Sequence, residues 1–259
     1  MQSGFQTLTQ VSVTSAALFL DFDGTLAHLA DQPENVRLDP MDLEELARVF
    51  HLLDGALAIV TGRDIATLDR FLAPYTFPVS GVHGFETRTL DGRIHRLSAN
   101  SEALARLEQV LVSYIGQHDG LLLERKPASL ALHYRQRPEL GPGCERAIAN
   151  ALHGETGLHL MQGKMVFEVK AHAGDKGQAI ASFLDSGPFR GRTPVFIGDD
   201  ITDESAFAAV NARSGMSIKV GLGETVARYR LADPGEVHDW LSRLRLGADQ
   251  NDLTEGMTT

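Results

Sequence analysis

The sequence is poor in cysteine, in long apolar runs and in positive charge. Cys144 is the one cysteine among 259 residues, which excludes an internal disulfide and a cysteine-rich zinc site. No run approaches the roughly 20 apolar residues of a membrane span, and residues 1–14 carry no lysine or arginine, so we expect no secretory signal. Lysine and arginine number 24 against 34 acidic residues, a net charge of −10. With no broad cationic surface, we expect a cytoplasmic protein that binds neither nucleic acid nor membrane.

The composition is that of an ordinary globular protein. Hydrophobic residues make up 43% of the chain and charged residues 22%. A chain of this length can bury its core as one large domain or as two modest ones. Residues 1–14 and 247–259 are polar and predict frayed ends.

Short, continuously apolar runs predict the strands of a parallel sheet. Residues 16–20, 56–60 and 194–198 are such runs, and each is followed by a polar residue. Strands of this kind are buried on both faces beneath helices. Apolar residues at helical spacing predict helices near 40–53, 65–72, 175–184, 203–210 and 237–244. This alternation predicts an α/β fold with a doubly wound parallel-sheet core.

The middle of the chain differs, because its predicted strands alternate apolar and polar side chains. The predicted elements are strands near 121–125, 129–135 and 165–170 and helices around 104–114 and 147–152. Alternation is typical of a sheet with one open face. We therefore predict an inserted α+β cap domain of residues 99–172, between core segments 1–98 and 173–259.

Polar motifs follow the predicted buried strands. The motifs are Asp21-Phe22-Asp23-Gly24-Thr25-Leu26, Thr61-Gly62-Arg63 and Gly198-Asp199-Asp200-Ile201-Thr202-Asp203, together with Gly174-Asp175-Lys176-Gly177 at a helix start. In an open α/β sheet, ligands collect beyond the carboxyl ends of the strands. Carboxylates as close as those of Asp21 and Asp23 repel unless a cation lies with them. Each motif alone has an explanation as a helix cap or a solvated charge, but together they predict one polar site.

These groups suit phosphoryl transfer. A few carboxylate and carbonyl oxygens, completed by water, are the ligands that Mg²⁺ prefers. The ammonium of Lys176 and the hydroxyl of Thr61 can hold phosphoryl oxygens, and in-line displacement needs mainly positioning and charge stabilisation. For Arg63 two readings stay open: it orients this loop, or it forms a salt bridge at the start of the next helix.

On these motifs the sequence resembles the haloacid dehalogenase superfamily of phosphatases and, within it, the trehalose-6-phosphate phosphatase family. The resemblance covers residues 18–244, and its narrower part rests on Gly81-Val82-His83-Gly84, Leu132-His133-Tyr134-Arg135, Gly163-Lys164 with Glu168, and the block from Gly198 to Glu204. It implies Mg²⁺-dependent hydrolysis of trehalose 6-phosphate, the last step of trehalose biosynthesis, by a monomer or weak homo-oligomer.

The resemblance also implies a role for each motif. Asp21 matches the nucleophile that becomes an aspartyl phosphate, and Asp23 matches the general acid and base. Thr61 and Lys176 match the residues that bind phosphate. The residues implied around Mg²⁺ are Asp21, Asp23 through its main-chain carbonyl, Asp199, Asp203 and Asp200.

Substrate choice is expected in the cap domain. Strand alternation puts Glu124 and Lys126 on one face, and Glu168 and Lys170 on one face of a later strand. Carboxylates accept hydrogen bonds from sugar hydroxyls and ammonium groups donate them, although from spacing alone a solvated face of mixed charge is the simpler reading. With the family pattern added, the expected substrate contacts are Glu124, Lys126, Glu168, Lys164, Arg135 and His83.

Two other functions stay open at this point. A phosphatase of another sugar phosphate, of the sucrose or mannosyl-glycerate type, would share the architecture. A receiver-like signalling domain would also gather acidic residues, a threonine and a lysine around Mg²⁺. Against the receiver, Asp23 offers a group that discharges an aspartyl phosphate, and a large insertion separates Thr61 from Lys176.

Overall fold

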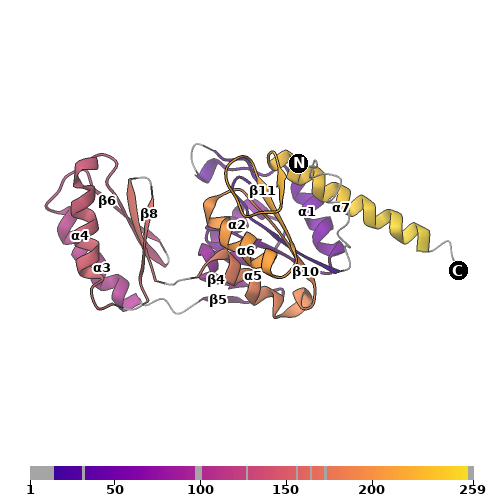
Figure 1. The fold of residues 1–259 in the computed structure, drawn as a ribbon, viewed down its shortest axis with the longest axis horizontal. Helices are drawn as coiled ribbons and strands as arrows, with labels where there is room; N and C mark the ends of the chain where they lie inside the picture. The colour runs from indigo at the N-terminus through magenta and orange to yellow at the C-terminus, as the bar shows by residue number, and fades with distance from the viewer. Residues whose placement is uncertain are drawn as a thin grey trace. The chain divides into compact units, whose positions relative to one another are not determined.

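The chain forms two units, seen in a computed structural model that describes residues 15–30, 33–96, 101–126, 128–155, 157–163, 165–171 and 174–255 (Figure 1). The core unit contains residues 1–95 and 175–259, and the insert unit contains residues 96–174. The domain boundaries predicted from the sequence, at residues 98 and 172, lie outside the described residues.

In the described part of the core unit, eight strands form one sheet in the order β12-β11-β10-β1-β2-β3-β4-β5. Their bounds are β1 Ala16–Leu20, β2 Leu57–Val60, β3 Val79–Gly81, β4 Glu86–Arg88, β5 Ile94–Arg96, β10 Thr193–Gly198, β11 Met216–Val220 and β12 Tyr229–Leu231. Pairing is parallel from β12 to β3, and β4 pairs antiparallel with β3. The central strand β1 lies between β10 and β2, so the chain returns to the middle of the sheet after the insertion.

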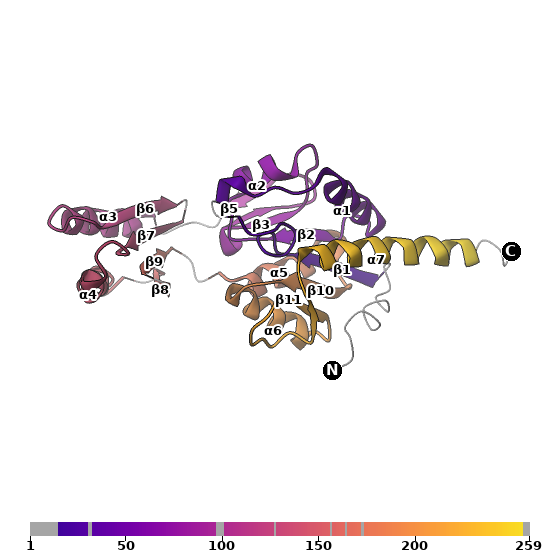
Figure 2. The ribbon, with the colours of Figure 1, turned by 90° about the horizontal axis from the view of Figure 1, so that it is seen from above.

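Helices cover both faces of this sheet. They are α1 Pro40–Leu52, α2 Ile65–Leu72, α5 Lys176–Leu184, α6 Glu204–Ala212 and α7 Pro234–Glu255. Figure 2 shows α5 and α6 on one side of the sheet and α1 and α2 on the other, and α7 packs against α1. All five residues of β1 are buried, as expected for a strand between two helical layers. The doubly wound α/β core predicted from the sequence is therefore confirmed.

Aspartate caps explain where three of these helices begin. The carboxylates of Asp39, Asp64 and Asp175 accept hydrogen bonds from main-chain N–H groups in the first turns of α1, α2 and α5. Such a cap satisfies a donor that has no partner within the helix. The cap at Asp175 matters most here, because the next residue in the chain is Lys176.

The insert unit is an antiparallel sheet with two helices. Its strands are β6 Leu122–Lys126, β7 Ser129–His133, β8 His159–Gly163 and β9 Val166–Lys170, in the order β6-β7-β9-β8, and its helices are α3 Ser101–Ile115 and α4 Gly141–Ala151. Leu132 and Phe167 point to one face of the sheet, where they join Leu111 and Ile148 of the helices in an apolar core. The opposite face carries the polar residues that the alternation predicted.

Some elements depart from the sequence prediction. The short strands β4, β5, β8 and β12 were not predicted. We expected a frayed end from residue 247 onward. This expectation is wrong as far as Glu255, because α7 continues to that residue. Between residues 247 and 255 the chain has no proline to interrupt the helical hydrogen bonds that begin at Pro234.

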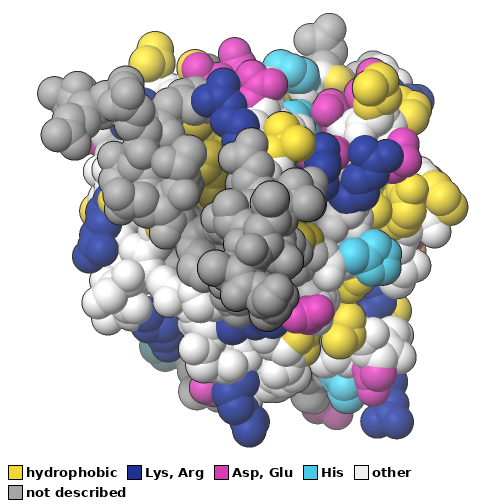
Figure 3. Space-filling model, turned by 90° about the vertical axis from the view of Figure 1, so that its right-hand side faces the viewer, with side chains coloured by type: hydrophobic (Ala, Val, Ile, Leu, Met, Phe, Trp, Pro, Cys, Tyr) yellow, Lys and Arg dark blue, Asp and Glu magenta, His cyan; other side chains and the backbone are white. Residues whose placement is uncertain are grey.

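The visible surface mixes charges of both signs with apolar side chains. Figure 3 shows Lys and Arg side chains interspersed with Asp and Glu over the described part of that face. Among the helices of the described ranges, none has the length and apolar character needed to span a bilayer.

Candidate active site

The predicted core-site residues lie at the carboxyl ends of neighbouring parallel strands. Asp21 follows β1, Thr61 follows β2 and Asp199 follows β10. Leu20 of β1 is in register with Ile59 and with Ile197, so the residues just beyond these strands meet at one edge of the sheet. This is the edge where ligands bind in open α/β sheets.

A buried lysine joins two of the predicted aspartates. Lys176, the first residue of α5, places its Nζ 2.8 Å from Oδ1 of Asp21 and 2.6 Å from Oδ1 of Asp203. All three side chains are buried, and Asp203 is fully enclosed. Carboxylate oxygens of Asp21, Asp199 and Asp203 lie within 4.8 Å of one another. The structure thus brings together four of the residues that the sequence predicted.

Burial dominates the electrostatics of this cluster. It raises the pKa of Asp21 to about 8; Lys176 opposes the rise, and the negative charge of Asp203 adds to it. Burial also raises the pKa of Asp199, again with a contribution from Asp203. For Lys176, burial alone would lower the pKa, but Asp21 and Asp203 raise it above the usual value. The lysine is therefore a permanent cation.

The cluster fits a divalent cation. It holds three carboxylates against one ammonium, and its oxygens are the hard ligands that Mg²⁺ and similar ions prefer. Among the described residues, Oδ1 of Asp199 is buried and has no hydrogen-bond partner. Buried polar atoms are normally satisfied, so an ion would complete the coordination of this atom.

Two glycines allow the carboxylates to approach so closely. A Cβ on Gly24 would overlap the Asp199 carboxylate, and one on Gly198 would lie 2.5 Å from Cγ of Asp203. Gly24 also has φ +77°, in the left-handed region that favours glycine. The glycine of the first motif is thus required both by backbone conformation and by the carboxylate beside it.

Asp200 lies outside the carboxylate cluster. Its side chain is exposed and accepts a 2.7 Å hydrogen bond from N–H of Ile201, while its own N–H donates to Oδ2 of Asp203 at 2.9 Å. These bonds cap the short 3-10 turn Ile201–Asp203. A metal contact of Asp200 stays a prediction.

Asp23 is held by Arg63 rather than by the cluster. The guanidinium binds the carboxylate through two hydrogen bonds of 2.6 Å, from Nε to Oδ2 and from Nη2 to Oδ1. The sequence left two readings of Arg63 open, and this pair explains how it ties the second motif to the first. Little in the sequence indicates this ion pair, because 40 residues separate Arg63 from Asp23.

Thr61 and His83 lie together in the core unit. The buried Thr61 hydroxyl accepts a 3.1 Å hydrogen bond from N–H of Arg63, and N–H of His83 donates to the Thr61 carbonyl at 3.1 Å. Val82 and His83 both have positive φ, of 49° and 53°. The imidazole lies against Gly62, where a Cβ would be 2.8 Å from Nε2 of His83. The turn therefore places His83 beside the loop of the second motif.

The polar face of the insert sheet carries the other predicted substrate contacts. Ser129 donates a 2.6 Å hydrogen bond to Oε1 of Glu168, and Nζ of Lys126 lies 3.4 Å from the same oxygen. Glu124 pairs with His133 at 2.9 Å. Burial alone would raise the pKa of Glu168, but the Ser129 hydroxyl and the nearby lysines bring it below its usual value. Glu168 is thus an ionised hydrogen-bond acceptor.

The two remaining predicted substrate contacts of the insert unit are Arg135 and Lys164. Arg135 is exposed and lines a hollow of about 590 Å³ with His133 and Leu122. Lys164 lies outside the described residues.

Lys219 was not predicted from the sequence, and it contacts the main chain of the site residue Asp199. It is a buried lysine in β11, and its Nζ donates to the main-chain carbonyls of Asp199 and, at 3.2 Å, of Val220. The sequence indication was a lysine between two apolar residues, Ile218 and Val220, since a lysine buried in a strand needs partners within the fold.

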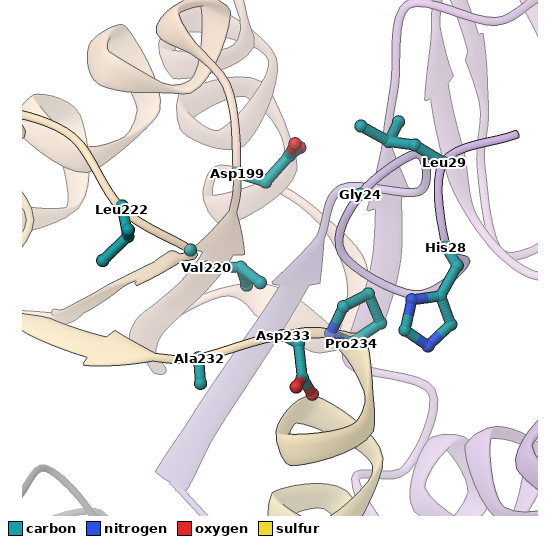
Figure 4. Close-up of a pocket in the computed structure, with 10 residues that line it drawn as sticks. Gly24, His28, Leu29, Asp199, Val220, Leu222, Ala232, Asp233 and Pro234 are labelled. Carbon is teal, nitrogen blue, oxygen red and sulfur yellow. The ribbon is translucent and has the colours of Figure 1, made fainter. Parts of the chain in front are cut away.

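A pocket of about 460 Å³ opens beside Asp199 (Figure 4). Gly24, His28 and Leu29 line one part of it, and the turns after β11 and β12 line another. In Figure 4 the Asp199 carboxylate points away from Asp233, so these two carboxylates do not form a second cation site.

Charged groups at the ends of parallel strands, in a core interrupted by an α+β unit, are the arrangement of haloacid dehalogenase-type phosphatases. Within that class, the family model described as trehalose-phosphatase matches residues 19–234, and the chain belongs to this family. Trehalose-6-phosphate phosphatase of Escherichia coli (strain K12) is 41% identical over 246 residues, which are 94% of this chain and 92% of that protein.

Solved structures agree. A trehalose-6-phosphate phosphatase related protein matches 92% of this chain and 100% of its own, with a TM-score of 0.72 and 28% identity. A phosphatase of the haloalkanoate (HAD) superfamily from Bacteroides thetaiotaomicron matches 90% of this chain and 95% of its own at a TM-score of 0.59, and at 17% identity it supports the fold alone. The family, a phosphatase family of sugar phosphates, also suggests a divalent metal, which the carboxylate cluster can accommodate.

Replacing Gly24 by alanine should reduce kcat/KM by about 10²-fold, because the new Cβ displaces the Asp199 carboxylate. Gly92→Ala is a matched control: Gly92 has φ +80°, and a Cβ added to it would meet no atom within 4 Å. Both variants carry the same backbone strain, on the order of 1 kcal/mol, and Gly24→Ala adds the overlap with Asp199. The melting temperature should therefore fall in both variants, by at least as much in Gly24→Ala, while phosphate release falls in Gly24→Ala alone. Equal activities would contradict this role of Gly24.

Proposed function

We propose that this chain hydrolyses trehalose 6-phosphate to trehalose and inorganic phosphate through an aspartyl phosphate on Asp21. The observation that carries the proposal is the contact of Lys176 with Asp21 and Asp203 at the sheet edge, beside Asp199. An oxygen nucleophile, a permanent cation and further carboxylates in one buried site are what phosphoryl transfer requires. The family and the Escherichia coli relative support the choice of substrate.

In the first half-reaction, an oxygen of Asp21 attacks phosphorus and the bond from phosphorus to the sugar oxygen breaks. The Asp23 carboxyl gives its proton to the departing sugar oxygen, so that trehalose leaves as a neutral alcohol. The Thr61 hydroxyl and the Lys176 ammonium bind phosphoryl oxygens and stabilise the charge that develops on them.

In the second half-reaction, water attacks the phosphorus of the aspartyl phosphate. The Asp23 carboxylate takes the proton from this water, and the bond between phosphorus and the Asp21 oxygen breaks. Inorganic phosphate leaves, and both aspartates return to their starting states. One residue serves as acid and then as base because each half-reaction restores the protonation state that the other needs.

The resident cation in this proposal is Mg²⁺. The carboxylates of Asp21, Asp199 and Asp203 would hold it, with the main-chain carbonyl of Asp23 and, as a further prediction, Asp200. When bound, the ion neutralises the charge of nucleophile and phosphate together. The unpartnered oxygen of Asp199 supports this assignment.

Sugar recognition is proposed for the insert unit, acting as a cap that closes over the bound substrate and excludes water. Glu124, Lys126 and Glu168 line the polar face of its sheet and offer acceptors and donors to hydroxyl groups. Arg135 and Lys164 are proposed as further contacts, and His83 as a contact from the core unit.

The direct test is phosphate release from a panel of trehalose 6-phosphate, sucrose 6-phosphate and glucose 6-phosphate. We expect trehalose 6-phosphate to have the highest kcat/KM by at least about 10²-fold, the scale that polar pockets achieve. EDTA should stop turnover, and added Mg²⁺ should restore it. Equal rates on the three esters would overturn the substrate assignment, and full activity in EDTA would overturn the assignment of the metal.

Asp21→Asn should reduce turnover by at least about 10³-fold, because a carboxamide is a poor nucleophile. The fold should persist. The raised pKa of Asp21, about 8, means that its ionised form is disfavoured in the folded chain, by more as pH rises from about 4 toward 8. Metal-free Asp21→Asn should therefore be at least as stable to urea as the metal-free parent at pH 8, with a smaller difference at pH 4. Activity above a tenth of the parent would argue against Asp21 as nucleophile.

Glu168→Ala should lower kcat/KM for trehalose 6-phosphate by about 10- to 100-fold, the worth of charge-assisted hydrogen bonds. The rate on p-nitrophenyl phosphate, which has no sugar hydroxyls, should stay close to that of the parent. Glu108→Ala is the control, because Glu108 on α3 pairs with Arg125 away from the polar face. An equal loss on both esters in Glu168→Ala would show that this face does not select the sugar.

A further inference from the structure

The ion pair between Arg63 and Asp23 is shorter and more buried than a typical surface ion pair. Both guanidinium contacts are 2.6 Å long, and the arginine side chain is only 11% exposed. The two contacts form the parallel fork that arginine makes with a carboxylate, which fixes the plane of the carboxylate as well as its position. A lysine would supply the charge without this geometry.

The arginine is itself fixed from several directions. Its guanidinium lies over the ring of Phe71, 4.9 Å from the centroid, and 5.7 Å from the centroid of Phe22. Its main-chain N–H donates to the Thr61 hydroxyl at 3.1 Å, and its carbonyl accepts from N–H of Val82 at 3.0 Å. Contacts of this kind restrict the rotamers of a long side chain before it meets Asp23.

The anchors of Arg63 belong to the same site. Phe22 separates Asp21 from Asp23 in the chain, and Thr61 is the proposed phosphate-binding hydroxyl. Asp23 has a side chain that is 31% exposed and is therefore free to rotate unless something holds it. Each carboxylate oxygen has two lone pairs, so the fork occupies one on each oxygen and leaves the other for proton transfer.

We propose that Arg63 is a positioning residue that fixes the Asp23 carboxyl group for proton transfer in both half-reactions. The inference rests on the role proposed for Asp23. The transferred proton passes from Asp23 to the sugar oxygen and later from water to Asp23, while Arg63 keeps all of its own protons. In this proposal Arg63 acts through Asp23.

The test is the dependence of rate on the leaving group. An acid matters most when the departing oxygen is basic, so losing it slows phenyl phosphate more than p-nitrophenyl phosphate. In Arg63→Met, kcat/KM should fall by about 10²-fold for phenyl phosphate and by about 3-fold or less for p-nitrophenyl phosphate, within the range of general acid catalysis. The ratio of the two rates is measured within one variant, so it does not depend on the fraction of protein that folds.

Three further variants define the reference points. Asp23→Asn should show the full leaving-group dependence of an enzyme without its acid. Arg63→Lys keeps the charge but not the fork, and its ratio should lie between those of the parent and Arg63→Met. Arg88→Met removes another buried arginine of the core unit, which pairs with Asp69, and its ratio should equal that of the parent.

The proposal is overturned if Arg63→Met slows both esters by the same factor, or neither, while Asp23→Asn changes their ratio. It also falls if Asp23→Asn leaves the ratio unchanged, because Asp23 is then not the acid. A chain that hydrolyses the aryl esters but not trehalose 6-phosphate would refute the proposed substrate alone, and the comparison of ratios would still decide the role of Arg63.

Discussion

Three carboxylates lie around one ammonium group at the edge of a parallel sheet, and this excess of negative charge is the constraint on which the site depends. Taking charges out of water is costly unless each finds a partner. Lys176 partners Asp21 and Asp203, but burial still raises the pKa of Asp21 and of Asp199. The site therefore favours an added cation.

The parts of the site that sequence reasoning found are those that local pattern decides. A parallel strand between two helical layers is apolar throughout, so the first polar residue after it falls at the carboxyl edge of the sheet. Asp21, Thr61 and Asp199 all follow such strands. Lys176 was found differently, because its motif lies at a predicted helix start, and in the structure Asp175 caps that helix, α5. The resemblance to the family then indicated the role of each of these residues, which the spacing of the residues alone does not indicate.

The features that were missed depend on contacts between distant parts of the chain. The pair of Asp23 and Arg63 spans 40 residues, and its geometry is set by the rings of Phe22 and Phe71. Lys219 reaches the carbonyl of Asp199 from a neighbouring strand. Three short strands of the core sheet were missed for a different reason: β4, β5 and β12 have three residues each, too few for a periodic pattern.

The two units divide the proposed work according to their kinds of sheet. In the core unit, the proposed catalytic side chains come from strand ends and from the start of α5, and they meet at one edge of the sheet. The insert sheet presents side chains along its length, and its carboxylates are already engaged: Glu168 with Ser129, and Glu124 with His133. Under the proposed function, a sugar must replace these hydrogen bonds rather than merely add new ones. A ligand that lacks the matching hydroxyls gains nothing from the exchange, and this difference in free energy is how such a face would distinguish one sugar phosphate from another.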